Sequence, residues 1–221
     1  LIALTACASP QPATQPETQP ETTEASPPAR GAAQPASLER PLPDSVRTPA
    51  PFDRSVRAGT RTRSGRPGPD YWQNRAEYDI DARLLPDEHV LEGTARITYH
   101  NRSPDTLRTV HVEMIQNVHR EGVVRNRALE ITGGIRVNGL EAGTRTLSAD
   151  PSTGPRYEVD GTRMVVYPGG PILPGEEIEL TIDYRFEVPR QGQGGRMGRS
   201  RDNLYYVGYW YPHVAAYDDV S

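Results

Sequence analysis

The chain has 221 residues and a mass of 24.4 kDa, but only 35% of it is hydrophobic and its mean hydropathy is -0.68. That is too little apolar material for one well-filled globule of this length. Its 25 basic residues, all arginine, are outnumbered by 29 acidic ones, and the net charge of -4 excludes an overall field that would attract nucleic acid. The single cysteine, Cys7, excludes an internal disulfide and every multi-cysteine metal site.

The amino terminus has the pattern of an exported protein. Residues 1–7 (LIALTAC) form a short apolar run that ends in small residues and a cysteine, which is typical of the end of a secretory signal. The stretch LTAC at positions 4–7 resembles the bacterial lipobox, in which a peptidase cleaves before the cysteine and the thiol receives a diacylglycerol. We therefore predict that Cys7 is a lipid-attachment site, and by the same resemblance Ala8 favours the outer membrane, or its periplasmic face. An accidental cysteine is the alternative.

Residues 8–70 have the composition of a disordered linker. Residues 1–70 hold 13 of the 22 prolines and only one of the 15 aromatic residues, Phe52. The segment is rich in Pro, Thr, Gln, Glu, Arg and Gly, and it shows neither helical nor strand periodicity. Such a composition cannot bury a core. We expect a solvated tether that holds a folded domain away from a membrane surface.

From residue 71 onward, apolar and polar residues alternate with the period of two that predicts β-strands. Strands are predicted over residues 78–84, 91–99, 110–114, 135–137, 157–159, 162–167 and 177–188. The pairs Asn138-Gly139 and Asp160-Gly161 are typical of two-residue hairpin turns. No window of comparable length has helical periodicity. The sequence therefore predicts an all-β domain over residues 71–221, built as an antiparallel sandwich and preceded by the linker.

The last residues of the chain are unusually rich in aromatic side chains. Seven of the last 17 residues are aromatic or histidine. We expect an extended segment that packs against a structure outside this chain, because large rings contribute most to such interfaces. The candidate interdomain or cleft-facing residues are Tyr209, Trp210, Tyr211, Tyr217 and Asp218. A stacking platform for a sugar, a peptide or a base is the alternative.

The sequence contains no complete catalytic or metal-binding motif. It has no His-Glu-x-x-His and no Gly-x-Ser-x-Gly. His111 and Glu113 share the polar face of a predicted strand, and His100 could complete a zinc site, but ordinary cross-strand polar pairs account for the same residues. Asp218 and Asp219 should point to opposite faces of a strand, which favours hydrogen bonds that fix a loop over shared acid–base catalysis. We assign no catalytic and no metal-binding residue.

Three segments together resemble the amino-terminal domain of the aminopeptidase N family of zinc metallopeptidases. Residues 71–114 (YWQNRAEYDIDARLLPDEHVLEGTARITYHNRSPDTLRTVHVEM) resemble the opening of that domain. Residues 173–189 (LPGEEIELTIDYRFEVP) resemble the strand that closes its first half. Residues 210–220 (WYPHVAAYDDV) resemble a segment of its bacterial, membrane-associated branch. The resemblance covers residues 71–221 and implies a saddle-like set of β-sheets.

The resemblance implies that this domain rests on a thermolysin-like catalytic domain and forms one wall of the substrate cleft. In the family, the zinc-binding His-Glu-x-x-His, its downstream glutamate and the Gly-x-Met-Glu-Asn motif belong to that later domain, and none is in this sequence. Some members also supply a Gln or Glu before the Trp-x-Pro motif, where residues 201–209 (RDNLYYVGY) have neither.

We therefore expect the non-catalytic portion of a membrane-anchored metallopeptidase. Because the chain begins without methionine and stops among aromatic residues, we expect a longer protein. Its zinc cofactor would lie in a downstream domain, and its substrate would be a peptide. The alternative is a lipid-anchored, non-enzymatic β-sandwich that binds a peptide, a glycan or a protein partner.

Overall fold

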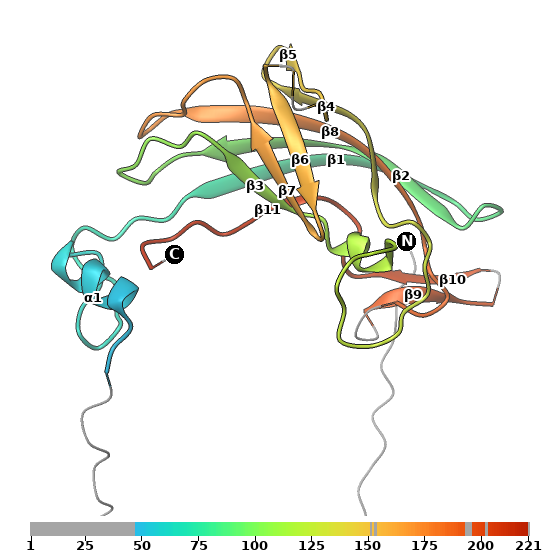
Figure 1. Ribbon diagram of the computed structural model, residues 1–221, viewed down its shortest axis with the longest axis horizontal. Helices are drawn as coiled ribbons and strands as arrows, with labels where there is room; N and C mark the ends of the chain where they lie inside the picture. Colours follow the sequence, from blue (N-terminus) through green and yellow to red (C-terminus); the bar gives the residue numbers. More distant parts are fainter. Residues whose placement is uncertain (1–46, 151, 153, 193–195, 202, 221) are drawn as a thin grey trace, which may run out of the picture. The chain divides into compact units, whose positions relative to one another are not determined.

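The computed structural model describes residues 47–150, 152, 154–192, 196–201 and 203–220, and Figure 1 shows the path of the chain. The predicted lipid-attachment site Cys7 and residues 8–46 of the predicted linker lie outside the described residues. Within those residues, no helix combines the length and the apolar character needed to cross a membrane. The residues from Arg47 onward belong to one unit.

A five-stranded antiparallel sheet has the strand order β1-β2-β8-β4-β5. Its members are β1 (Arg75–Leu85), β2 (Val90–His100), β8 (Glu177–Glu187), β4 (Arg136–Ala142) and β5 (Arg145–Thr146). β1 and β2 form the predicted hairpin, with Leu85 opposite Val90. β8 pairs along the other edge of β2 and along β4, so this strand of clearest alternation lies in the middle of the sheet (Figure 1).

A four-stranded antiparallel sheet has the order β11-β3-β7-β6. Its members are β11 (His213–Val214), β3 (Val110–Glu113), β7 (Arg163–Tyr167) and β6 (Arg156–Asp160). β6 and β7 form the hairpin predicted at Asp160-Gly161, where Gly161 has a φ of 55°. A 3-10 helix, η1 (Ile115–His119), follows β3, and β9 (Met197–Ser200) pairs with β10 (Leu204–Val207) in a separate hairpin.

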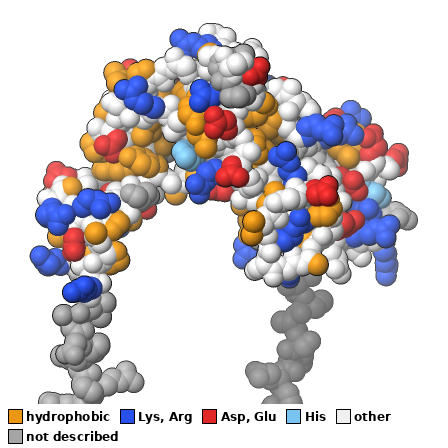
Figure 2. All heavy atoms as spheres, in the orientation of Figure 1, with side chains coloured by type: hydrophobic (Ala, Val, Ile, Leu, Met, Phe, Trp, Pro, Cys, Tyr) orange, Lys and Arg blue, Asp and Glu red, His pale blue; other side chains and the backbone are white. Residues whose placement is uncertain are grey.

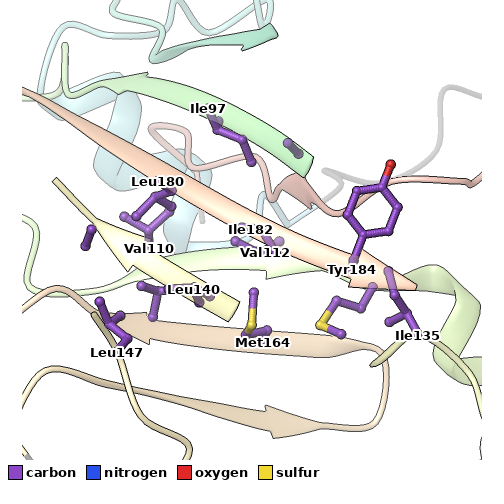
Figure 3. Close-up of a cluster of buried hydrophobic side chains, with 14 of the residues drawn as sticks. Ile97, Val110, Val112, Ile135, Leu140, Leu147, Met164, Leu180, Ile182 and Tyr184 are labelled. Carbon is purple, nitrogen blue, oxygen red and sulfur yellow. The ribbon is translucent and has the colours of Figure 1, made fainter. Parts of the chain in front are cut away.

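The two larger sheets share one hydrophobic core (Figure 3). Ile97 and Ile182 of the five-stranded sheet are fully buried, as are Val112 and Met164 of the four-stranded sheet. Because side chains alternate along a strand, each sheet contributes one apolar face to this core. The predicted antiparallel all-β fold is confirmed.

The turn predicted at Asn138-Gly139 is wrong. Both residues lie inside β4, where the pairing with β8 shifts between Val137 and Gly139. The chain instead turns between β4 and β5 at Gly143, which has a φ of 58°. A glycine inside an alternating segment can mark either a hairpin turn or a β-bulge, and the local sequence does not distinguish these two structures.

The linker prediction is wrong for residues 47–70, which are folded. Helix α1 (Ala50–Arg57) has Pro51 in its first turn and is followed by Gly59 with a φ of 77°. Proline suits the first turn because its missing N–H would have no partner there, and a glycine in the left-handed region commonly ends a helix. Both signals are present in the sequence, but a helix of eight residues is too short to show a convincing apolar period.

Candidate functional site

A polar cluster attaches the segment around α1 to the C-terminal segment. We call it the clasp, and its members are Ser55, Thr60, Arg61 and Asp219. Arg61 donates from Nε and Nη2 to the Asp219 carboxylate, with N–O distances of 2.7 to 3.0 Å. Thr60 Oγ1 donates to Oδ2 of the same carboxylate at 2.7 Å, and Ser55 Oγ donates to the backbone carbonyl of Asp219. The clasp therefore joins residues that are more than 150 positions apart.

The clasp strongly favours the ionised form of Asp219. Its side chain is only 2% exposed. The hydrogen bonds from Arg61 are the main reason that the pKa of Asp219 is lowered to about 2, and they outweigh the effect of burial, which acts in the opposite direction. The neighbouring Asp218 accepts a hydrogen bond at Oδ1 from the backbone N–H of Val220 at 2.9 Å. The prediction of loop-fixing hydrogen bonds for both carboxylates is confirmed, whereas a cleft-facing role for Asp218 stays a prediction.

Tyr217 fixes the same segment two residues before Asp219. Its hydroxyl donates to Oδ2 of Asp105 at 2.7 Å, and its ring centroid lies 5.5 Å from that of Trp72. The hydrogen bond to Asp105 is the main reason that the pKa of Tyr217 is raised to about 12. The backbone N–H of Ala215 donates to the carbonyl of His111 at 2.8 Å, which extends the pairing of β11 with β3.

Four rings gather beside β1, and we call them the aromatic cluster: Tyr78, Trp210, Tyr211 and His213. The ring centroid of Tyr211 lies 5.6 Å from Tyr78, 5.0 Å from Trp210 and 6.2 Å from His213, in each case with the rings edge to face. This is a favourable arrangement for aromatic pairs. The Tyr78 hydroxyl accepts a hydrogen bond from the backbone N–H of Val214 at 2.9 Å. The cluster is therefore attached to both β1 and β11.

The aromatic C-terminal segment packs partly against this chain's own core. Tyr209, Trp210 and Tyr211 are half-buried and contact the core residues. The Tyr209 carbonyl accepts a hydrogen bond from Nε2 of Gln116, and its hydroxyl accepts one from Arg196 Nη1 at 3.1 Å. These rings therefore also contact this chain's own core, and their packing against a structure outside this chain stays a prediction.

The apolar face of β1 is largely uncovered. Tyr78 is 36% exposed and Leu84 is 37% exposed; Ala82 is also exposed, and Ile80 is half-buried. We call these four residues the β1 stripe. They lie on the same face of the sheet as the buried residues of β2, because Ile80 is opposite Ala95. Little of the described chain covers this continuation of the core-facing surface, which the alternation in the sequence did not reveal.

The opposite face of the five-stranded sheet is charged. It carries ion pairs between neighbouring strands, such as Arg96–Asp79 at 3.5 Å and Arg185–Glu92 at 3.6 Å. Each exposed pair contributes little to stability. The two faces of β1 are therefore chemically distinct, one solvated and charged and the other apolar and half-exposed.

The three residues considered as a zinc site are not brought together. His100 ends β2 between Glu77 and Glu177, with N–O distances of 3.2 and 3.0 Å. His111 and Glu113 belong to β3 of the other sheet, and the residue opposite Glu113 is His213. The pairing of His100 with them is wrong. Within the described ranges, no group of three or more His, Cys, Asp or Glu residues is placed so that it could hold a metal ion.

Scans against protein-family models and against curated proteins find no match to this chain. The family resemblance carried by residues 71–114, 173–189 and 210–220 therefore remains an expectation.

Proposed function

We propose that this chain is the non-catalytic β domain of an exported, membrane-anchored zinc metallopeptidase. The hydrolytic centre would belong to a further domain, and the lipid anchor would be attached at Cys7. The proposal starts from the resemblance of residues 71–114, 173–189 and 210–220 to the aminopeptidase N family. It assigns this chain a supporting role, as one wall of a peptide cleft.

The observation that carries the proposal is the uncovered β1 stripe beside the aromatic cluster. Tyr78 belongs to both, and its ring lies 5.6 Å from that of Tyr211. Half-exposed rings and aliphatic side chains are what a domain interface uses, because they bury apolar area on contact. The charged opposite face suits contact with water. A further domain would rest on the β1 stripe, and the exposed sides of Tyr209, Trp210 and Tyr211 would line the cleft.

The residues of this chain would position a peptide and exclude water from it. The clasp and the Tyr217–Asp105 hydrogen bond hold the aromatic segment at its C-terminal end, and the bond from Val214 to Tyr78 holds it at β1. A wall fixed in this way loses little conformational freedom when a peptide binds. Zinc held by the further domain would supply the Lewis acid for amide hydrolysis, and no residue of this chain is assigned to bind it.

Expression of the complete reading frame of the gene tests the proposal. We expect about one zinc ion per protein, as in catalytic sites of this kind, and release of amino-terminal residues from peptides. A chelator should abolish the activity, and added zinc should restore it. The 221-residue chain alone should give neither zinc binding nor hydrolysis. A reading frame that encodes no pair of zinc ligands, or zinc-dependent hydrolysis by the 221-residue chain alone, would contradict the proposal.

Two substitutions at adjacent positions of β1 test whether the β1 stripe is the contact with a further domain. One lies on the apolar face of the strand and the other on its charged face. Leu84 and Arg83 are both exposed but point to opposite faces of β1. We expect Leu84→Glu to weaken the association of this chain with a separately expressed catalytic domain by at least about tenfold, because it places a charge in an apolar contact. The matched control Arg83→Glu should change it by less than about twofold. Equal effects of the two substitutions would exclude the stripe as the contact.

The anchor can be tested by replacing Cys7. The serine variant has no thiol to receive a lipid, and each buried methylene of an acyl chain contributes roughly 0.8 kcal/mol to membrane affinity. We expect the Cys7→Ser protein to leave the membrane fraction of the expressing bacterium, as measured by detergent-phase partitioning. An unchanged distribution would show that Cys7 is not the anchor.

A lipid-anchored, non-enzymatic binding module is the second candidate function. The half-exposed rings of the aromatic cluster favour it, since Trp and Tyr faces stack on sugars and peptides. A reading frame without zinc ligands, together with glycan or peptide binding that Trp210→Ala abolishes, would support this function instead.

A further inference from the structure

A pocket of about 570 Å³ opens where β3 and β11 separate. The hydrogen bond from Ala215 to His111 lies at the end of the pairing of the two strands, and beyond it Tyr217 donates a hydrogen bond to Asp105. The pocket is lined by residues 106–111 on one side and 214–217 on the other. We call it the β3–β11 pocket, and its volume lies in the range typical of small-ligand sites.

The mouth of the pocket is positively charged although the chain as a whole is acidic. Arg108, His111 and Arg163 line the pocket, and no described Asp or Glu does. All three are exposed. Among the described residues, Arg108 has no ion-pair partner, and Arg163 reaches only Glu113 at the long distance of 3.9 Å. Arg108, a cationic group with no counter-charge among the described residues, attracts an anion.

The pocket is also lined by aliphatic side chains and by hydroxyl groups. Leu107 and Val214 supply aliphatic surface, and Thr106 and Thr109 supply hydroxyls. Figure 2 shows side chains by type, and in the region of β3 hydrophobic side chains lie beside both basic and acidic ones.

The pocket walls are fixed without a ligand. Tyr99 is 4% exposed, and its hydroxyl accepts a hydrogen bond from Asn74 Nδ2 at 2.8 Å. Tyr217 is held by Asp105 and by its ring contact with Trp72. A preformed pocket saves the ordering cost of binding.

We propose that the β3–β11 pocket binds the carboxyl-terminal end of a peptide. The terminal carboxylate contacts Arg108 and Arg163, because guanidinium groups donate charge-assisted hydrogen bonds to carboxylates, and it lies within reach of the His111 ring. The last side chain of the peptide is apolar and packs against Leu107 and Val214. The hydroxyls of Thr106 and Thr109 suit the amide groups of a peptide better than the bare alkyl chain of a fatty acid. This inference stands on the pocket alone and does not depend on the proposed function.

Calorimetric titration of the 221-residue chain tests the inference. The probe is the peptide Ala-Ala-Leu-Phe, used as the free acid and as the C-terminal amide. We expect the free acid to bind at least about tenfold more tightly than the amide, because the amide lacks the charge that the pocket recognises. Arg108→Gln and Arg163→Gln should each weaken binding of the free acid about fivefold or more. The matched control Arg136→Gln, an exposed arginine of β4, should leave it unchanged.

Octanoate and inorganic phosphate serve as competitors that distinguish the peptide from other anions. We expect neither to displace the free-acid peptide at equal concentration. Equal binding of acid and amide, displacement by phosphate or octanoate, or full affinity of both pocket variants would overturn the inference. Circular dichroism of the variants serves as the control for folding. We expect the variants to remain folded, because substitution of an exposed arginine seldom affects stability strongly.

Discussion

Asp219 shows how a single residue acquires its chemistry from distant parts of the chain. In the sequence it is one of two adjacent carboxylates, and nothing near it is basic. In the structure, Arg61, which lies 158 positions earlier, and Thr60 surround it. Its ionised state is therefore a property of the folded protein.

We expect Asp219→Asn to lower the free energy of unfolding by about 1–2 kcal/mol at pH 7. The pKa of Asp219 is lowered from 3.8 to about 2, and each pKa unit corresponds to about 1.4 kcal/mol before screening by solvent. Urea unfolding of the variant and the wild-type chain measures the difference. Asp81→Asn, at an exposed position of β1, is the matched control and should change stability by less than about 0.5 kcal/mol.

The same pair of proteins tests the pH dependence of the clasp. The pKa of Asp219 is lower in the folded state than in the unfolded state, so its stabilisation is complete above about pH 5 and is lost as the pH falls from about 4 towards about 2. The difference in stability between wild type and Asp219→Asn should therefore shrink over that range. A difference that stays constant down to pH 2 would show that the carboxylate charge is not the cause.

At the scale of the elements, the contact between Gly93 and Tyr184 fixes the packing of β2 against β8. The two residues are opposite each other, and a Cβ atom on Gly93 would lie 2.9 Å from the Tyr184 hydroxyl and 2.7 Å from the Asp81 carbonyl. Tyr184 is 1% exposed, and burial is the main reason that its pKa is raised to about 12. The ring can lie across β2 because residue 93 has no side chain.

We expect Gly93→Ala to destabilise the chain by about 1–3 kcal/mol, because the added methyl group would overlap a backbone oxygen that cannot move freely. Thermal or urea unfolding measures the change. Gly154→Ala is the matched control, since a Cβ atom there would meet nothing within 4 Å, and it should change stability by less than about 0.5 kcal/mol. A neutral Gly93→Ala would show that β2 is packed less tightly against β1 and Tyr184 than described.

The strands were the most predictable elements, and the connections were the least. β1, β2, β7 and β8 follow from alternation, which depends only on near neighbours. The bulge in β4 could not be told from a hairpin turn, because the outcome depends on which strand β4 pairs with. Helix α1 was missed because its stability comes from contacts of Ser55 and of the following loop with Asp219.

At the scale of the whole molecule, the folded unit begins at Arg47 rather than near Tyr71. We expect deletion of residues 1–46 to leave the melting temperature unchanged. Deletion of residues 1–70 should lower it by at least about 4 °C, because it removes α1 and three of the four members of the clasp. It should also make residues 217–220 accessible to proteases. Equal melting temperatures of the two truncated chains would mean that residues 47–70 do not contribute to the fold.

The candidate site could be predicted only in part. The density of aromatic residues identified the segment that contains Tyr209, Trp210 and Tyr211. The clasp, the uncovered β1 stripe and the β3–β11 pocket could not be found in the same way, because each brings together residues from separate segments of the chain. In the sequence, the members of these sites are isolated residues such as a single arginine or threonine. Such a residue indicates no site until its partners in the fold are known.

The class of the fold, the positions of most strands and the absence of a zinc-binding motif from these 221 residues all follow from the amino-acid sequence. These properties depend on composition and on spacing over a few residues, where strand geometry alone sets the period. The strand pairing, the uncovered apolar face of β1 and the ionised state of Asp219 are known only from the folded chain. Those outcomes depend on contacts between residues far apart in the chain, and local patterns carry no information about such contacts.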